Sequence, residues 1–401
     1  MTSAADTFEP FNAVADPREL GFDPERLAHV EASIAKDIED EMYDGAALIV
    51  GRGGKTAYAT VQGYADRASG RRLQADDVFV TFSSGKQFTV VAVLHYVERG
   101  LLQLHRPVAE IIPEFASNGK AKINLGHLLT HTSGIAPFAP LENPADVQNL
   151  QKHVAAISAM APDTMPGSAV KYSITTAHAV MAEMVRRVDG GTRAYRRILE
   201  EEIFAPLGMN DTAIGLPDRL RHRVCPVVVS DRSPGLLDPA MLEGTEQGLH
   251  EQSEMAAGGY VTTVADFARF AEMLRNGGSL NGVRILSPGT IDLATQNRTG
   301  DMPNDIWNYC VESRHWPLFP ANLGLGFFLR GSGVFPTPFG VLASSGTYGG
   351  FGAGSTCFHI DPAKDLFVAY LSTGLLEESR SVERHQRMAD MVHASLGEGT
   401  L

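Results

Sequence analysis

The chain has 401 residues, 44% of them hydrophobic, which is enough to bury a large core and suggests about two domains. Its 47 acidic residues outnumber its 34 basic residues, and the formal net charge of −13 argues against a nucleic-acid partner. The cysteines Cys225, Cys310 and Cys357 are far apart and form no C-x-x-C pair, so the sequence predicts neither a disulfide framework nor a metal site.

The amino terminus does not have the pattern of a secretory signal. It lacks a basic segment followed by an apolar one, and no later stretch reaches the roughly 18 apolar residues of a membrane span. We therefore expect no membrane partner. Together with the three isolated cysteines, this favours a reducing, cytoplasmic location.

The sequence of the first quarter of the chain predicts a helix, a hairpin and a second, buried helix. The signals are apolar spacing, a glycine-rich turn, and a glycine suited to the position after a helix end. In chain order the elements are a helix near 24–40, a strand at 45–50, a turn at 51–54, a return strand to about 64, a strand at 78–82 and a helix from 88 to about 100.

Helical patterns dominate up to about residue 255, and strands dominate the last part of the chain. The later elements are helices at 176–188, 194–204, 263–276 and from 287, strands at 323–329, 340–344, 355–360 and 366–371, and a final amphipathic helix. We therefore predict an α+β fold in which both ends of the chain, 1–80 and 260–401, form a sheet domain. A mostly helical domain, 81–259, is inserted between them, with the active site where the two domains meet.

A serine and a lysine three residues apart stand at the junction between the strand at 78–82 and the helix that follows. The pattern Ser-x-x-Lys occurs at Ser33/Lys36, Ser83/Lys86, Ser117/Lys120 and Ser168/Lys171. The first of these lies within an amphipathic helix, the third in a loop, and the fourth after a Pro-Gly turn. Only Ser83 opens a long apolar helix, so we select it as the candidate nucleophile.

The spacing of this pair suits nucleophilic catalysis. Residues i and i+3 of a helix share a face, so Lys86 can bring its amine close to the Ser83 hydroxyl. A lysine acts as the base only if burial or a neighbouring cation lowers its pKa. At a helix start the backbone N–H of Ser83 can also face a developing oxyanion.

Two further segments supply the partners that this chemistry requires. In the first, the phenol of Tyr172 can act as a general base if cations keep it deprotonated, or can shuttle a proton beside Lys86. The second is Ser344-Ser345-Gly346-Thr347-Tyr348, at the end of a predicted strand. There Gly346 allows close approach of a substrate carbonyl, and the N–H of Thr347 is predicted to complete the oxyanion hole with that of Ser83.

These motifs together resemble the serine β-lactamase and penicillin-binding-protein superfamily, specifically the class C-like branch that includes many esterases. Further matching segments are Leu128 to Gly134, Pro206-Leu207-Gly208-Met209, Gly258 to Thr263, and Leu286-Ser287-Pro288. The resemblance covers nearly the full chain. It implies a β-lactamase/transpeptidase-like fold, with an antiparallel sheet flanked by helices, and an acyl-enzyme on Ser83.

Two departures from the family pattern bear on the substrate. The usual Tyr-x-Asn is Tyr172-Ser173-Ile174 here, so the amide that binds a substrate side-chain carbonyl is missing. The usual Lys-Thr-Gly or His-Thr-Gly is Ser344-Ser345-Gly346, so the cation that meets a substrate carboxylate is missing as well. Both losses weaken the case for β-lactams and cell-wall peptides.

The sequence thus predicts a serine hydrolase for a small-molecule ester or amide, with Ser83, Lys86 and Tyr172 as catalytic residues and no cofactor. Ser344, Ser345, Gly346 and Tyr348 are predicted to contact the substrate. One alternative is an acyltransferase of natural-product metabolism that uses the same site. Another is a scaffold that binds a ligand without turnover.

Two other features are assigned no catalytic role. His131, in Thr130-His131-Thr132-Ser133-Gly134, is expected to brace a turn after a helix rather than to join a catalytic triad. The aromatic segment from Trp307 to Phe319 is open to three interpretations: a rim over the pocket, a packed loop, or the contact of a homodimer.

Overall fold

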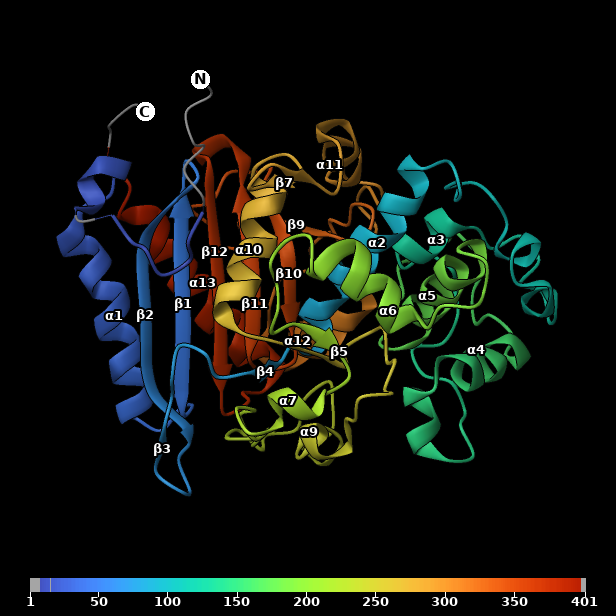
Figure 1. The fold of residues 1–401 in the computed structure, drawn as a ribbon, viewed down its shortest axis with the longest axis horizontal. Coiled ribbons are helices and arrows are strands. Elements are labelled where there is room, and N and C mark those ends of the chain that lie inside the picture. The colour runs from blue at the N-terminus through green and yellow to red at the C-terminus, as the bar shows by residue number, and fades with distance from the viewer. Residues whose placement is uncertain (1–7, 15, 398–401) are drawn as a thin grey trace.

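A seven-stranded antiparallel sheet forms one side of the molecule (Figure 1). The computed structural model describes residues 8–14 and 16–397. The strand order is β3-β2-β1-β12-β11-β10-β9. The bounds are β1 Gly45–Arg52, β2 Lys55–Asp66, β3 Arg71–Arg72, β9 Phe328–Leu329, β10 Tyr348–Gly352, β11 Thr356–Asp361 and β12 Leu366–Thr373. Because β1 pairs with β12 along its whole length, from Gly45↔Thr373 to Arg52↔Leu366, the two ends of the chain share one sheet.

Helices cover both faces of this sheet. Successive side chains of a strand point to opposite faces, so Leu48 and Val50 of β1 pack on one side, while Ala47 and Ile49 pack on the other. Helices α1 (Pro24–Glu39) and α13 (Glu378–Ala394) cover the first face, and α10 (Val264–Arg275) covers the second (Figure 1). The predicted α+β fold class is confirmed, and the sheet contains strands from both ends of the chain.

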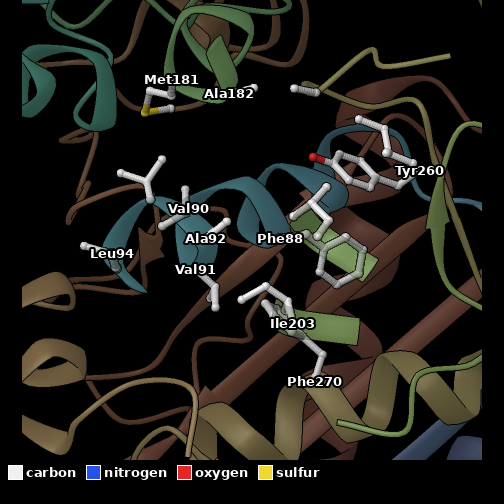
Figure 2. Close-up of a cluster of buried hydrophobic side chains, with 14 of the residues drawn as sticks. Phe88, Val90, Val91, Ala92, Leu94, Met181, Ala182, Ile203, Tyr260 and Phe270 are labelled. Carbon is white, nitrogen blue, oxygen red and sulfur yellow. The ribbon is translucent and has the colours of Figure 1, made fainter. Parts of the chain in front are cut away.

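The helical part lies beside the sheet and is organised around α2 (Lys86–Glu98) (Figure 1). This helix is apolar on all sides, which is typical of a helix that is completely surrounded. Figure 2 shows Met181 and Ala182 on one side of α2 and Phe270 of α10 on the other. The Phe88 ring lies 4.7 Å from that of Phe270 and 5.4 Å from that of Tyr260. The start of α2 is therefore fixed between the helical part and the sheet.

The remaining elements are mostly short. The helices are α3 Leu125–Leu129, α4 Leu150–Ala159, α5 Thr176–Val188, α6 Tyr195–Leu199 with a π turn at Glu200–Phe204, α7 Asp218–Arg221, α8 Pro239–Leu242, α9 Thr245–Gly248, α11 Pro288–Ala294 and α12 Asn308–Arg314. The 3-10 turns are η1 Pro17–Leu20, η2 Phe82–Gly85, η3 Val108–Glu110, η4 Pro113–Ala116, η5 Pro144–Gln148, η7 Asp305–Trp307 and η8 Pro362–Lys364. The small sheets are β4 Phe79–Val80, β6 Tyr260–Thr262 and β5 Ala213–Ile214, and β7 Ser279–Leu280 with β8 Val283–Arg284. In the part of the chain that the structure describes, no helix is long and apolar enough to cross a membrane.

One predicted strand is wrong, and its correction affects the site. Residues 340–344 lie in turns and irregular backbone, and the strand is instead β10, at Tyr348–Gly352, next to the edge strand β9. Three of the five residues of β10 are glycine, which has a low strand propensity, so the local sequence gave no strand signal. The predicted strand at 323–329 is also reduced to the two residues of β9.

Candidate active site

Ser83 lies in the tight turn η2 that leads from β4 into α2. The residue before it, Phe82, has a φ of 49°, a left-handed conformation that is unfavourable for a bulky side chain and recurs at functional sites. Gly85 is required at the end of the turn, because a Cβ there would lie 2.5 Å from Thr81 Oγ1. The neighbouring Ser84 is buried, and its hydroxyl lies 2.9 Å from Thr81 O. Ser83, in contrast, is half-buried and lines a cavity.

Lys86 reaches the Ser83 hydroxyl from the first turn of α2. Its Nζ lies 3.0 Å from Ser83 Oγ, 2.9 Å from Ile174 O and 2.8 Å from Ala257 O. Burial lowers the pKa of Lys86 to about 7. A neutral amine has two N–H groups and one lone pair. With both N–H groups donated to the two carbonyls, the lone pair is left for the hydroxyl of Ser83.

Tyr172 lines the same cavity as Ser83 and is packed between rings. The His131 ring stacks on it at 4.5 Å between centroids, and Lys86 Nζ lies 5.1 Å from the centroid of its ring. Burial raises the pKa of the Tyr172 phenol, and a hydrogen bond with the Ser83 side chain offsets part of that rise. The phenol is therefore protonated at neutral pH, which argues against the predicted alternative of a phenolate base.

His131 holds Tyr172 in position. Its carbonyl accepts from the N–H of Lys171 at 2.8 Å, and its Nδ1 accepts from the N–H of Ser173 at 3.0 Å. Burial, together with the charge of Lys86, lowers the pKa of His131 to about 3, so the ring stays neutral. Its contacts agree with the expected structural role, since they fix the segment that carries Tyr172.

The strand beside Ser83 is not the predicted one. A Cβ on Gly352 would lie 3.0 Å from the N of Ser83 and 2.3 Å from the O of Thr81, so only glycine lets β10 approach the turn this closely. Ala353, which follows, lines the cavity. In the described part of the chain, neither the N–H of Ser83 nor that of Ala353 donates to a protein acceptor.

The structure corrects the prediction for Thr347, because its N–H donates to Ser344 O at 3.0 Å and so cannot face an oxyanion. The rest of that run also lies away from the cavity. Ser345 and Gly346 are exposed in a turn, and the N–H of Ser344 donates to Asp361 Oδ2 at 2.9 Å. The buried Tyr348 donates its hydroxyl to Leu274 O at 3.2 Å. The four predicted substrate contacts are therefore structural.

The cavity in front of Ser83, open part included, has a volume of about 500 Å³ and is mostly apolar. It is lined by Ser83, Tyr172, Ile174, Leu236, Leu237, Ile306, Trp307, Phe351, Gly352, Ala353, Gly354, Glu378 and Ser381. None of these is a lysine, arginine or histidine. Ile174 lines the cavity at the position where the family usually has asparagine.

Several lining residues were not predicted from the sequence, because they come from distant loops and from the start of α13. Glu378 accepts the N–H groups of Leu236 and Leu237 at 3.0 and 3.2 Å, and thereby fixes this loop over the cavity. Burial raises the pKa of its carboxyl. Trp307 belongs to the aromatic segment, and its place on the cavity wall supports the interpretation of that segment as a rim. Among the described residues, no three acidic, histidine or cysteine side chains gather as a metal site.

The chain is similar to known proteins over most of its length. The sequence profile of the family described as Beta-lactamase matches residues 30–392. The chain is 26% identical over 365 residues to the Esterase/beta-lactamase LipL of Mycobacterium tuberculosis, covering 84% of this chain and 80% of LipL.

Two solved structures share the fold. A penicillin-binding protein homologue from Caulobacter crescentus superposes with a TM-score of 0.77 at 26% identity, covering 94% of this chain and 99% of the homologue. A family VIII carboxylesterase superposes with a TM-score of 0.76 at 23% identity, covering 90% of this chain and 97% of the carboxylesterase. The chain thus has the β-lactamase/transpeptidase-like fold and belongs to the beta-lactamase family.

Proposed function

We propose that this member of the family is a serine hydrolase that cleaves an ester, or an amide, through an acyl-enzyme on Ser83. The observation that carries the proposal is the position of Lys86. Its amine is buried, has a pKa of about 7, and is within hydrogen-bond distance of the Ser83 hydroxyl. A lysine that is neutral at physiological pH is the base that a serine nucleophile requires.

The proposed reaction has two halves. Ser83 Oγ bonds to the substrate carbonyl carbon while its proton passes to Lys86 Nζ, and the N–H groups of Ser83 and Ala353 donate to the resulting oxyanion. The phenol of Tyr172 donates a proton to the leaving alcohol and regains one from Lys86, so the C–O bond breaks and the acyl-enzyme forms. Water then attacks the acyl carbon, gives its proton to the same base, and releases the acid as Ser83 Oγ is reprotonated.

The charge of the cavity favours uncharged substrates. Among the described residues, no cationic side chain lines it, and one acidic residue, Glu378, lies on its wall. A substrate carboxylate, such as that of a β-lactam, finds no partner there and is repelled when Glu378 is ionised. The LipL relative, named an esterase as well as a β-lactamase, supports an ester substrate.

The test is hydrolysis of p-nitrophenyl butyrate by the wild type and by Ser83→Ala. We expect turnover by the wild type and only background hydrolysis by the variant. Equal rates would reject the proposal and favour a scaffold that binds a ligand without turnover. A chromogenic cephalosporin, assayed in parallel, is expected to show weak turnover or none.

The apolar cavity also supports a second candidate function, acyl transfer to an alcohol or amine. An apolar wall favours binding of an organic acceptor over water in front of the acyl-enzyme. Adding butanol to the p-nitrophenyl butyrate assay tests this. Formation of butyl butyrate in place of part of the butyric acid would support it, and unchanged butyric acid release would reject it.

A further inference from the structure

Behind the wall of the active-site cavity lies a second crevice. Its volume is about 310 Å³, open part included, and aromatic rings and prolines form most of its surface. Trp307 and Phe351 line both spaces. Their rings are stacked, with centroids 5.6 Å apart and planes 22° apart. We call this stacked pair the aromatic partition, because it separates the two spaces.

The partition lies close to the reacting atoms. Phe351 directly precedes Gly352, whose backbone packs against the N of Ser83. Phe351 and Trp307 also line the same cavity as Ser83, so a chain attached to a carbonyl carbon on Ser83 can contact both rings. Trp307 is only 7% exposed, and the rings of Trp316 and Phe319 lie 6.4 and 6.2 Å from it. These neighbours hold it in place across the wall.

The far side of the partition is apolar. Phe319 and Phe335 stack there, with centroids 5.2 Å apart and planes 2° apart, and Phe328 packs on Phe351 at 4.7 Å. In the described part of the chain, no charged side chain lines this crevice. The function assigned to the first cavity does not require such a space.

We propose that the second crevice is an extension of the acyl-binding site and that Trp307 sets the length of acyl chain that the enzyme accepts. This inference rests on the proposed function, since it needs an acyl-enzyme on Ser83. The wild type accepts short aliphatic acyl groups, which end at the Trp307 ring. Removal of that ring joins the two spaces, so a medium-length chain reaches the apolar crevice.

The experiment measures kcat/KM for p-nitrophenyl acetate, butyrate and octanoate, where the leaving group is constant and the acyl chain varies. Each methylene that becomes buried raises kcat/KM by about fourfold. For Trp307→Ala we expect the octanoate-to-butyrate ratio to rise at least ~10-fold over the wild type, which corresponds to two or more newly buried methylenes. Phe11→Ala is the control: it removes an exposed aromatic ring that lines neither space, and should leave the ratio within about twofold.

Two outcomes separate this inference from the proposed function. If the wild type and Trp307→Ala hydrolyse acetate in a Ser83-dependent way but share one octanoate-to-butyrate ratio, the acyl-length role of Trp307 is wrong and the hydrolase proposal stands. If Ser83→Ala equals the wild type on all three esters, the hydrolase proposal fails, and this inference fails with it.

A second variant and a second series of esters complete the experiment. Trp307→Leu, which keeps an apolar side chain of smaller reach, should show an intermediate ratio and replaces Trp307→Ala if that variant does not fold. Alkyl acetates of increasing alcohol length test the leaving-group side. A chain-length shift in that series alone would assign the crevice to the alcohol and would overturn the acyl assignment.

Discussion

Two of the four Ser-x-x-Lys pairs place a buried lysine against backbone carbonyls, and they differ in the partner of the hydroxyl. Lys86 and Lys120 are 2% and 0% exposed, and burial lowers the pKa of both. Lys86 contacts two carbonyls and the hydroxyl of its own serine. Lys120 contacts three carbonyls, those of Ser117, Ser158 and Met160.

The second pair is structural. The Ser117 hydroxyl donates to Ser158 O at 2.7 Å, and Lys120 donates to carbonyls at the end of α4. A cation at a helix carboxyl end complements the helix dipole. With all three N–H groups donated to carbonyls, Lys120 has no lone pair available for a proton. Both pairs therefore have the same spacing, but of the two lysines only Lys86 contacts the hydroxyl of its serine, as a base must.

Removing the hydroxyl of each serine should separate the two pairs by the largest difference in activity. Ser83→Ala should lower kcat for p-nitrophenyl butyrate by ~10⁴-fold or more, because the acyl-enzyme cannot form. Ser117→Ala should leave kcat within about twofold, since its hydroxyl bonds only to the carbonyls of Glu114 and Ser158. A loss of activity in Ser117→Ala with an unchanged circular dichroism spectrum would contradict the distinction between the pairs.

Replacing each lysine by methionine distinguishes the catalytic lysine from the structural one. Lys86→Met should reduce kcat by ~10³-fold, since no base remains for Ser83. Lys120→Met removes three hydrogen bonds to carbonyls and should lower the free energy of unfolding by about 1–3 kcal/mol, with kcat nearly unchanged. Steady-state kinetics and urea denaturation of both variants decide this. Substantial activity in Lys86→Met would mean that another group is the base.

A pair of glycines tests which backbone segment faces Ser83. In Gly352→Ala the new Cβ meets Thr81 O and Ser83 N, so the turn or the strand must shift, and we expect a loss of ~10²-fold in kcat. Gly346→Ala places its Cβ in open space and should have no effect. The reverse result, with Gly346 sensitive and Gly352 tolerant, would restore the sequence-based assignment of the strand motif.

The smallest expected effect is the pH dependence. The base form of Lys86 is the neutral amine, so activity rises as the pH increases through its pKa of about 7. Between pH 6 and pH 8 the neutral fraction, and with it kcat/KM for the butyrate ester, should increase ~10-fold. Lys120→Met should show the same profile. A profile that is flat over this range, or that falls, would exclude Lys86 as the base.

The sequence predicted the parts of the site that depend on local structure. Ser83 and Lys86 lie within one helical turn, so their contact follows from the helix itself. Most predicted helices, and the pairing of the chain ends in one sheet, followed from apolar periodicity and capping signals. One example is Thr263, whose side chain accepts from the N–H of Asp266 at 3.2 Å at the start of α10.

The remaining parts depend on contacts between distant segments. The strand beside Ser83 was misplaced because the run from Gly349 to Gly354 is too rich in glycine to read as a strand, although close approach requires those glycines. Leu236 and Glu378 were missed because they meet only after folding, with the carboxylate of one holding the loop of the other. No local pattern encodes such a contact.

Formation of an acyl-enzyme on Ser83 can be observed by intact-mass analysis during turnover of p-nitrophenyl butyrate, followed by peptide mapping of the acid-quenched enzyme. We predict a single butyryl adduct on the peptide that contains Ser83. The adduct should be absent from Ser83→Ala, and more of it should accumulate when its hydrolysis is slow. Turnover by the wild type with the adduct on any other residue, including Ser117, would show that Ser83 is not the nucleophile.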